Sequence, residues 1–261
     1  MLTSLNKRAT YAIVAISVIL STIMLFFALQ KMSTGTIRDT DLYANNWSGY
    51  SAVSSDTTFD SISASWTVPE VKSTPAPGYS AVWIGIGGIL DKSNKLIQAG
   101  TEEDIQADRS KNYYAWVEAL PRPAINIGSV LPGDLINVKI NKIGNSQSTW
   151  HVTLSRESRG IVTTLIENDL VARANSASRG SAEFIVEAPT AVSGSSNKLL
   201  PLADFGSVTF TNCTTNIGDL GSLKNIYKFT MTNDGTREGT RLATPGPLLS
   251  NDSFDVDWHN Q

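Results

Sequence analysis

Short runs of β-branched and aromatic residues, broken by Gly, Pro, Asn and Ser, make up the chain from residue 45 onward. Turn signals separate them, such as Pro-Gly at 77–78 and 132–133 and Asp-Gly at 234–235. No convincing amphipathic helix lies between these runs, so the pattern predicts an antiparallel β-sandwich or barrel. The predicted strands are Ser61–Val68, Ser80–Ile86, Leu96–Ala99, Tyr113–Ala119, Leu135–Ile140, Ser148–Ser155, Ile161–Glu167, Ala182–Glu187, Ser207–Thr211 and Ile226–Thr232.

Alternation within the predicted strands assigns side chains to faces. In segment 182–187, Phe184 and Val186 are predicted to point into the core, which places Glu183 and Glu187 on the opposite face. At 3.3 Å per residue, these two glutamates lie about 13 Å apart, too far to share one proton directly.

The same reasoning groups other polar and aromatic residues. Trp116 shares a face with Glu118, Gln98 shares one with Leu96, and Trp83 lies with Gly85. A face that carries both aromatic and polar side chains could form a substrate cleft across a sheet. The pattern alone nevertheless favours a solvated outer face.

The N-terminal region differs from the rest. Tyr11–Leu29 is an uncharged apolar run of 19 residues that follows Lys7 and Arg8. As a helix it would span about 28 Å, close to the thickness of a bilayer's hydrocarbon core. It is therefore read as a retained membrane anchor or a cleaved signal peptide, with a buried core helix as the alternative.

This reading divides the chain into three parts. Residues 1–30 form the signal peptide or anchor, residues 31–44 a linker, and residues 45–261 one all-β domain. We expect the domain to be extracellular, either secreted or tethered to the membrane by residues 11–29.

Composition removes several classes of function. The net charge is -3 and charged residues make up 17% of the chain, which excludes a basic nucleic-acid binder. Cys213 is the single cysteine, and there are only 2 histidines, which excludes an internal disulfide and the usual four-ligand zinc sites. No G-x-S-x-G motif occurs. We therefore expect no metal and no cofactor, and a chemistry of carboxylates, amides, hydroxyls or aromatics.

Seven segments occur in an order and spacing that resemble one family, the glutamic peptidases, also called eqolisins. The resemblance covers the chain from about residue 45 to the C-terminus. The segments are Asn46-Trp-Ser-Gly-Tyr50, Ala64-Ser-Trp-Thr-Val-Pro69, Val82-Trp-Ile-Gly-Ile86, Leu96-Ile-Gln-Ala-Gly100, Tyr114-Ala-Trp-Val-Glu118, Ala182-Glu-Phe-Ile-Val-Glu187 and Ala203-Asp-Phe-Gly-Ser-Val-Thr-Phe-Thr-Asn212.

The resemblance implies a β-sandwich of two curved antiparallel sheets and an acid-acting endopeptidase without a cofactor. Its partners would be polypeptide substrates, with the enzyme a monomer. The family's catalytic glutamine falls on Gln98. Its catalytic glutamate falls on Glu187, which closes its motif, with Glu183 on the same face as the reserve candidate.

Four further positions match residues that line or support the family's substrate cleft. These are Trp83, Trp116, Glu118 and Glu183. Core packing is the alternative for the two tryptophans, and a solvated strand face is the alternative for Glu118.

A glutamine and a glutamate together cover the tasks of peptide hydrolysis. The carboxylate can accept the proton of water and return it to the leaving nitrogen. The amide can orient the water through its oxygen and donate an N–H to the oxyanion. A free glutamate titrates near 4.3, which fits an acidic working pH.

Some positions depart from the family pattern. Fungal members often have Asp where Gly87 and Tyr114 stand, and Trp where Ala119 and Phe184 stand. The second hypothesis is therefore a non-catalytic cell-surface β-sandwich that binds carbohydrate or protein at the same face. The third is an anchored structural protein without a ligand.

Overall fold

The computed structural model describes residues 40–74, 76–89, 95–145, 148–171, 179–193 and 196–260. These residues form strands and one short 3-10 helix, Leu220–Ser222. The strands are β1 (Thr40–Ala44), β2 (Trp47–Val53), β3 (Ser61–Thr67), β4 (Gly78–Ile86), β5 (Ile97–Ile105), β6 (Lys111–Ala119), β7 (Ile125–Ser129), β8 (Leu135–Lys142), β9 (Thr149–Ser158), β10 (Ile161–Val171), β11 (Ser181–Glu187), β12 (Thr190–Ser193), β13 (Ser196–Leu199), β14 (Ser207–Thr215), β15 (Gly218–Asp219), β16 (Ile226–Thr232), β17 (Arg241–Ser250) and β18 (Ser253–Trp258).

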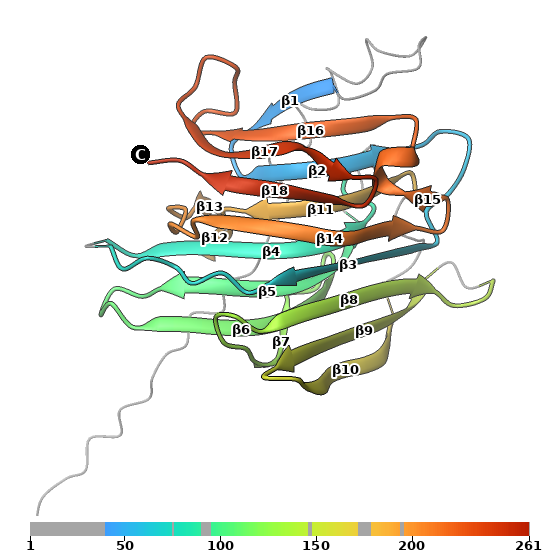
Figure 1. Ribbon diagram of the computed structural model, residues 1–261, viewed down its shortest axis with the longest axis horizontal. Coiled ribbons are helices and arrows are strands. Elements are labelled where there is room, and N and C mark those ends of the chain that lie inside the picture. The colour runs from blue at the N-terminus through green and yellow to red at the C-terminus, as the bar shows by residue number, and fades with distance from the viewer. Residues whose placement is uncertain are drawn as a thin grey trace, which may run out of the picture.

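The strands pack as two layers around one core (Figure 1). One layer has the order β10-β9-β8-β3-β14-β18-β17, and the other has the order β16-β2-β11-β4-β5-β6-β7. Pairing of β16 with β17 joins the layers at one side, so the hydrogen-bonded ladder is continuous. At the other side, Arg156 of β9 donates to the carbonyl of Ser129 at 2.6 Å. The predicted all-β fold is confirmed, although the two sheets form one nearly closed ladder rather than separate sheets.

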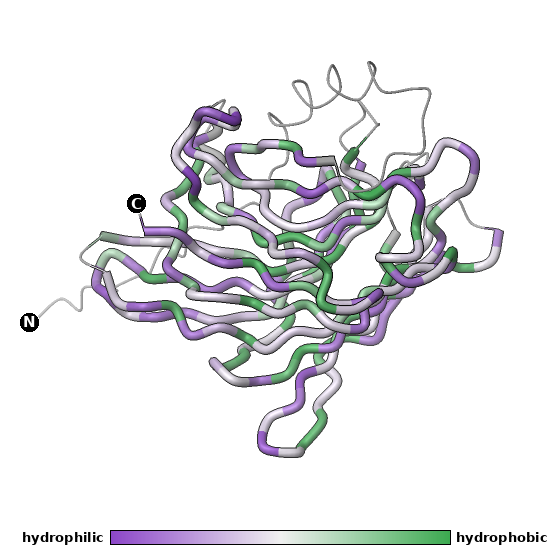
Figure 2. Tube along the Cα trace, turned by 45° about the horizontal axis from the view of Figure 1, so that its top comes forward, coloured by the Kyte–Doolittle hydropathy of each residue, from purple (hydrophilic) through white to green (hydrophobic). Residues whose placement is uncertain are grey.

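The main core lies between the layers. Phe184 and Val186 are fully buried in it, as alternation predicted. Trp66 of β3 donates its indole N–H to Thr101 of β5 at 3.0 Å, which links the two layers inside the core. Figure 2 shows the alternation of hydrophobic and hydrophilic positions along the strands.

The opposite face of the second layer is also covered. Trp47, Trp83, Trp116, Ile185 and Phe229 belong to a second buried apolar cluster there. Trp47 and Trp83 meet edge to face, with ring centroids 5.2 Å apart. The solvated outer face that the pattern favoured is therefore wrong for this layer, because its alternate positions carry large aromatic groups that must be buried.

The ten predicted strands all correspond to observed strands, several of which run further than predicted. The described end of the predicted linker, Thr40–Ala44, instead forms β1, which pairs in parallel with β16. The predicted helix at residues 11–29 lies outside the described residues. Among the described residues, no helix is long and apolar enough to cross a membrane.

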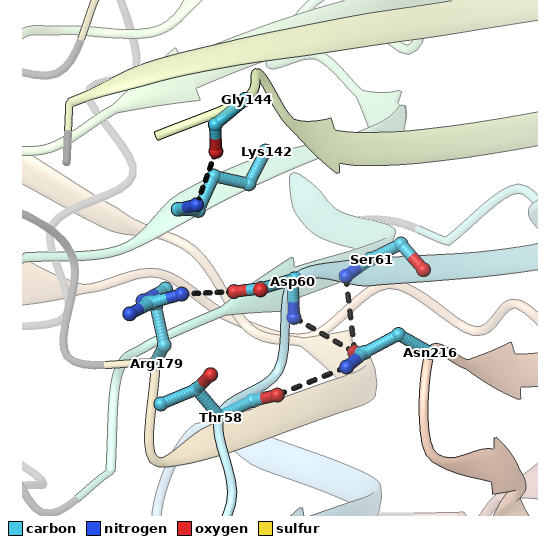
Figure 3. Close-up of polar contacts among 7 residues, drawn as sticks. All are labelled: Thr58, Asp60, Ser61, Lys142, Gly144, Arg179 and Asn216. Atoms are coloured by element: carbon cyan, nitrogen blue, oxygen red, sulfur yellow. Dashed lines mark hydrogen bonds and ion pairs between the residues drawn. The ribbon is translucent and has the colours of Figure 1, made fainter. Parts of the chain in front are cut away.

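Polar contacts fix the connection between β2 and β3 (Figure 3). The side-chain oxygen of Asn216 accepts the backbone N–H groups of Asp60 at 2.7 Å and Ser61 at 3.2 Å. Its amide nitrogen donates to the carbonyl of Thr58 at 3.0 Å, and Arg179 pairs with Asp60. These hydrogen bonds add to the apolar packing of Phe59, which anchors the same connection in the main core.

One carboxyl group lies on the core side of β5. Glu103 is fully buried, and neither of its carboxyl oxygens has a hydrogen-bond partner of good geometry among the described residues. Ser80 and Tyr113 are its cross-strand neighbours, and Asp104 follows it in the chain. Burial raises its pKa well above the ordinary value, against a lowering effect of Thr101 and with a further rise from Asp104. The native fold therefore favours the neutral form of Glu103.

Raising the pH should destabilise the protein, because the pKa of Glu103 is higher in the folded state than in the unfolded chain. Stability from the neutral carboxyl is complete below the unfolded pKa, about 4.3, and is lost as the pH rises through the folded pKa. Urea unfolding between pH 4 and pH 8 measures this. Glu103→Gln, which cannot ionise, should make the pH dependence shallower by the share of this one carboxyl, whereas the exposed control Glu167→Gln should leave it unchanged. An identical pH dependence in Glu103→Gln and the wild type would contradict the account.

Candidate active site

Three strand registers place Glu183, Gly85, Gln98 and Glu118 in one row across the sheet. Glu183 of β11 pairs with Gly85 of β4, Gly85 pairs with Gln98 of β5, and Gln98 pairs with Glu118 of β6. Directly paired residues in an antiparallel sheet point to the same face. Adjacent strands are about 4.8 Å apart, so Glu183 and Gln98 flank a glycine with about 10 Å between their Cα atoms.

The amide of Gln98 is held on one side. Its Nε2 donates to the carboxyl of Glu118, and both residues are buried. Gln98 Oε1 and Glu118 Oε1 have no hydrogen-bond partner within the described part of the chain. Burial raises the pKa of Glu118 to about 9, against a lowering effect of the Gln98 hydrogen bond. The Oε1 atom of Gln98 is therefore a buried acceptor that remains available for a hydrogen bond.

Glu183 lies on the other side of Gly85, and its carboxyl group is also available for a hydrogen bond. It is fully buried, and its two oxygens lack partners of good geometry among the described residues. Ser51 of β2 is its cross-strand neighbour, and Ser51 Oγ is also buried without a partner there. Burial raises the pKa of Glu183 to about 8, with a lowering effect of Ser181.

Glu187 occupies a different row. It pairs with Ala81 of β4, four residues along β11 from Glu183 and therefore about 13 Å from it. Its oxygens accept the indole N–H of Trp83 at 2.9 Å and the amide N–H of Asn46 at 3.1 Å. Burial raises its pKa to about 8 despite the lowering effects of Trp47, Trp83 and Asn46. The structure thus brings Gln98 together with Glu118 and opposite Glu183, and it does not bring Gln98 together with Glu187.

Two tryptophans occupy the row between Glu183 and Glu187. Trp83 pairs with Gly100, and Gly100 pairs with Trp116, so the two indoles flank a glycine. A Cβ at Gly100 would lie 2.2 Å from the carbonyl oxygen of Val82 and 2.5 Å from Trp83 Cβ. Only glycine therefore fits beside Trp83.

Gly85 separates Glu183 from Gln98 for a related reason. A Cβ there would lie 2.8 Å from Leu96 Cδ1 and 3.0 Å from Trp83 Cζ3. The edge of the Trp83 indole therefore reaches over Gly85. Because it is a glycine, this position adds no side chain of its own between the glutamate and the glutamine, and the edges of Trp83 and Leu96 lie there instead.

The sequence reading missed two acidic residues on the same face of β5. Glu102 and Asp104 lie four and six residues after Gln98. These are even separations, so alternation alone would have placed them on the same face. Burial raises the pKa of Glu102 well above its usual range and that of Asp104 to about 7. Within the described residues, no group of three or more His, Cys, Asp or Glu side chains is arranged to hold a metal ion.

Comparison with known sequences shows that this chain is similar to one protein family and to one of its relatives. The profile of the peptidase A4 family matches residues 45–253. Aspergillopepsin-2 of Aspergillus niger is 27% identical over 194 residues. That match covers 65% of this chain and 64% of the relative, so it spans slightly less than two thirds of the relative's length.

Solved structures share the fold. A scytalido-glutamic peptidase with a transition-state analogue inhibitor has a TM-score of 0.67 and 22% identity, covering 83% of this chain and 100% of that one. SCP-B, an eqolisin in complex with the tripeptide Ala-Ile-His, has a TM-score of 0.58 and 21% identity with the same coverage. At these identities the likeness establishes the fold. Because the family profile matches most of this chain, the chain belongs to the peptidase A4 family of glutamic endopeptidases, the eqolisins, as the sequence motifs indicated.

Proposed function

We propose that this protein hydrolyses peptide bonds in acid with a water molecule held between Gln98 and Glu183. The observation that carries the proposal is their common row, in which Gly85 adds no side chain of its own between them, so that the edges of Trp83 and Leu96 bound this place. Buried oxygens of both residues lack hydrogen-bond partners of good geometry among the described residues, and ordered water binds to buried polar atoms of this kind. This pair replaces the pair of Gln98 and Glu187 that the motif alone favoured, because Glu187 lies in another row with both oxygens engaged.

Below neutral pH, Glu183 enters the reaction as a neutral acid, because burial raises its pKa to about 8. Its O–H donates a proton to the carbonyl oxygen of the substrate while its second oxygen accepts a proton from the attacking water. Gln98 Oε1 accepts the other O–H of this water and so orients its lone pair toward the carbonyl carbon. The product is a neutral gem-diol, and Glu183 still carries one proton.

Collapse of the gem-diol completes the reaction. Glu183 gives its proton to the amide nitrogen, and the C–N bond breaks as one hydroxyl of the diol returns a proton to the other oxygen of Glu183. The products are a carboxylic acid and an amine, with Glu183 restored. Because each step needs the protonated carboxyl, the rate should fall as the pH rises through the pKa of Glu183.

The neighbouring residues have supporting roles in this proposal. Glu118 fixes the amide of Gln98, and Trp83 and Trp116 form apolar walls that contact the substrate. Gln98 and Glu183 are buried in the described conformation, so binding of a polypeptide requires displacement of the chain that covers this face.

We further propose that the domain predicted at residues 45–261 also includes β1 from residue 40, since β1 pairs with β16, and that it works as a monomer. We also propose that it works outside the cell, because the apolar run at residues 11–29 reads as a signal peptide or membrane tether.

Gln98→Ala and Glu183→Gln should each abolish cleavage of a denatured protein, since the first removes the acceptor for water and the second removes the acid. The assay measures pepstatin-insensitive cleavage from pH 2 to pH 9, and the rate should be retained in acid and fall as the pH rises through the pKa of Glu183, about 8. The controls are Gln106→Ala and Glu167→Gln, which change the same residue types away from the row.

Wild-type rates in either site variant would contradict the assignment. A folded wild-type protein that cleaves nothing between pH 2 and pH 7 would instead favour the non-catalytic binding protein.

Gly85→Ala should lower kcat/KM at least about tenfold, because the new methyl group displaces Trp83 or Leu96 and intrudes between Glu183 and Gln98. It should also cost about 1–3 kcal/mol of stability through overpacking. Gly246→Ala is the matched control, since its Cβ would meet only an ordinary contact at 3.8 Å. Full activity in Gly85→Ala would show that the space over this glycine is not used.

A further inference from the structure

Glu187 and Trp83 are joined by a buried hydrogen bond that the proposed reaction does not use. The indole N–H of Trp83 donates to Glu187 Oε2 at 2.9 Å, and both side chains are fully buried. A hydrogen bond to a planar indole fixes the ring plane as well as the position of its nitrogen. Glu187 therefore determines how the Trp83 ring lies on the sheet.

The other end of the same ring reaches the proposed reaction space. Trp83 Cζ3 lies 3.0 Å from the position that a Cβ on Gly85 would take, between Glu183 and Gln98. Trp47 packs against the ring edge to face at 5.2 Å, and the backbone of Gly100 lies so close to the base of the Trp83 side chain that an added Cβ would be 2.5 Å from Trp83 Cβ. A rotation of the indole at its nitrogen end thus moves its far edge over Gly85.

We propose that Glu187 is a positioning residue, which acts in its neutral form and holds the Trp83 indole as the wall of the space between Gln98 and Glu183. This rests on the proposed function. It differs from the motif-based expectation, in which Glu187 is itself the base.

The neutral form is consistent with the surroundings of Glu187. Glu102 from β5 and Glu118 from β6 lie close enough for the charge of Glu187 to raise their pKa values, and both neighbours are acidic. Among the described residues, no lysine or arginine forms an ion pair with Glu187. Burial without a cation favours the protonated acid.

Asn46 provides the partner that a protonated Glu187 requires. Its Nδ2 donates to Glu187 Oε1 at 3.1 Å, while its Oδ1 is buried without a partner among the described residues. A half turn of this amide exchanges the two atoms, so that Oδ1 accepts the O–H of the neutral acid. Glu187 then donates to Asn46 and accepts from Trp83, and a glutamine at this position would make the same two bonds.

Steady-state kinetics at acid pH test the proposal with Glu187→Ala, Glu187→Gln, Trp83→Phe and the double variant of Glu187→Ala with Trp83→Phe. Glu187→Ala should lower kcat on the order of 100-fold with little change in KM, because a misplaced wall disturbs the reacting groups. Glu187→Gln should restore kcat to within about threefold of the wild type, a difference of less than 1 kcal/mol in barrier. In the Trp83→Phe background, Glu187→Ala should cause little further loss, since both changes remove the same bond.

The outcomes separate this proposal from the proposed function. Glu187→Gln as inactive as Glu183→Gln, or a full additional loss from Glu187→Ala in the Trp83→Phe background, would overturn the positioning role. Activity retained in Glu183→Gln would instead overturn the catalytic assignment. If Glu187→Ala does not fold, Glu187→Gln and Trp83→Phe still decide, because the first should be active and the second impaired in kcat.

Discussion

The pairing register of β4 against its two neighbours, β11 and β5, is the constraint on which the candidate site depends. It sets Glu183, Gly85 and Gln98 in one row. A slip of one residue would turn Gln98 into the main core, because side chains alternate between faces. The register is secured on both faces at once. Phe184 and Val186 fill the main core, while Ile185 and Trp83 fill the second apolar cluster. Close packing at the glycines leaves no alternative fit beside Trp83.

Burial of neutral carboxyl groups links this architecture to acid conditions. Glu103 lies on the core side of β5, whereas Glu183 and Glu187 lie on the site side of β11. Desolvation raises the pKa of all three. In acid these groups are uncharged, so their burial costs less and the fold retains them without cations. In the proposed reaction the same protonation supplies the acid for peptide hydrolysis, so stability and the proposed chemistry favour the same pH range.

The sequence predicted the all-β fold and the positions of ten strands along the chain, because alternation and turn residues are local signals. It also placed Gln98, Trp83, Trp116 and Glu118 on one face. It could not choose between Glu183 and Glu187, because these residues share a face and differ only in their cross-strand partners. Register is a long-range property, set by packing against β2 and β4 rather than by residues within β11.

Other features of the fold and the site were also not predicted from the sequence. Alternation favoured a solvated face, since polar residues between aromatics look exposed when a second apolar cluster is not foreseen. The strand nature of Thr40–Ala44 depends on pairing with β16, far along the chain. Glu102 and Asp104 were within reach of the pattern, because they continue the spacing of two from Gln98.

A high-resolution crystal structure at about pH 4 tests the central claim most directly, because that claim is the place of one water molecule. The account predicts an ordered water over Gly85, about 2.6–3.2 Å from both Gln98 Oε1 and a carboxyl oxygen of Glu183. An empty space at Gly85, or a water that links Gln98 to Glu187 instead, would contradict it.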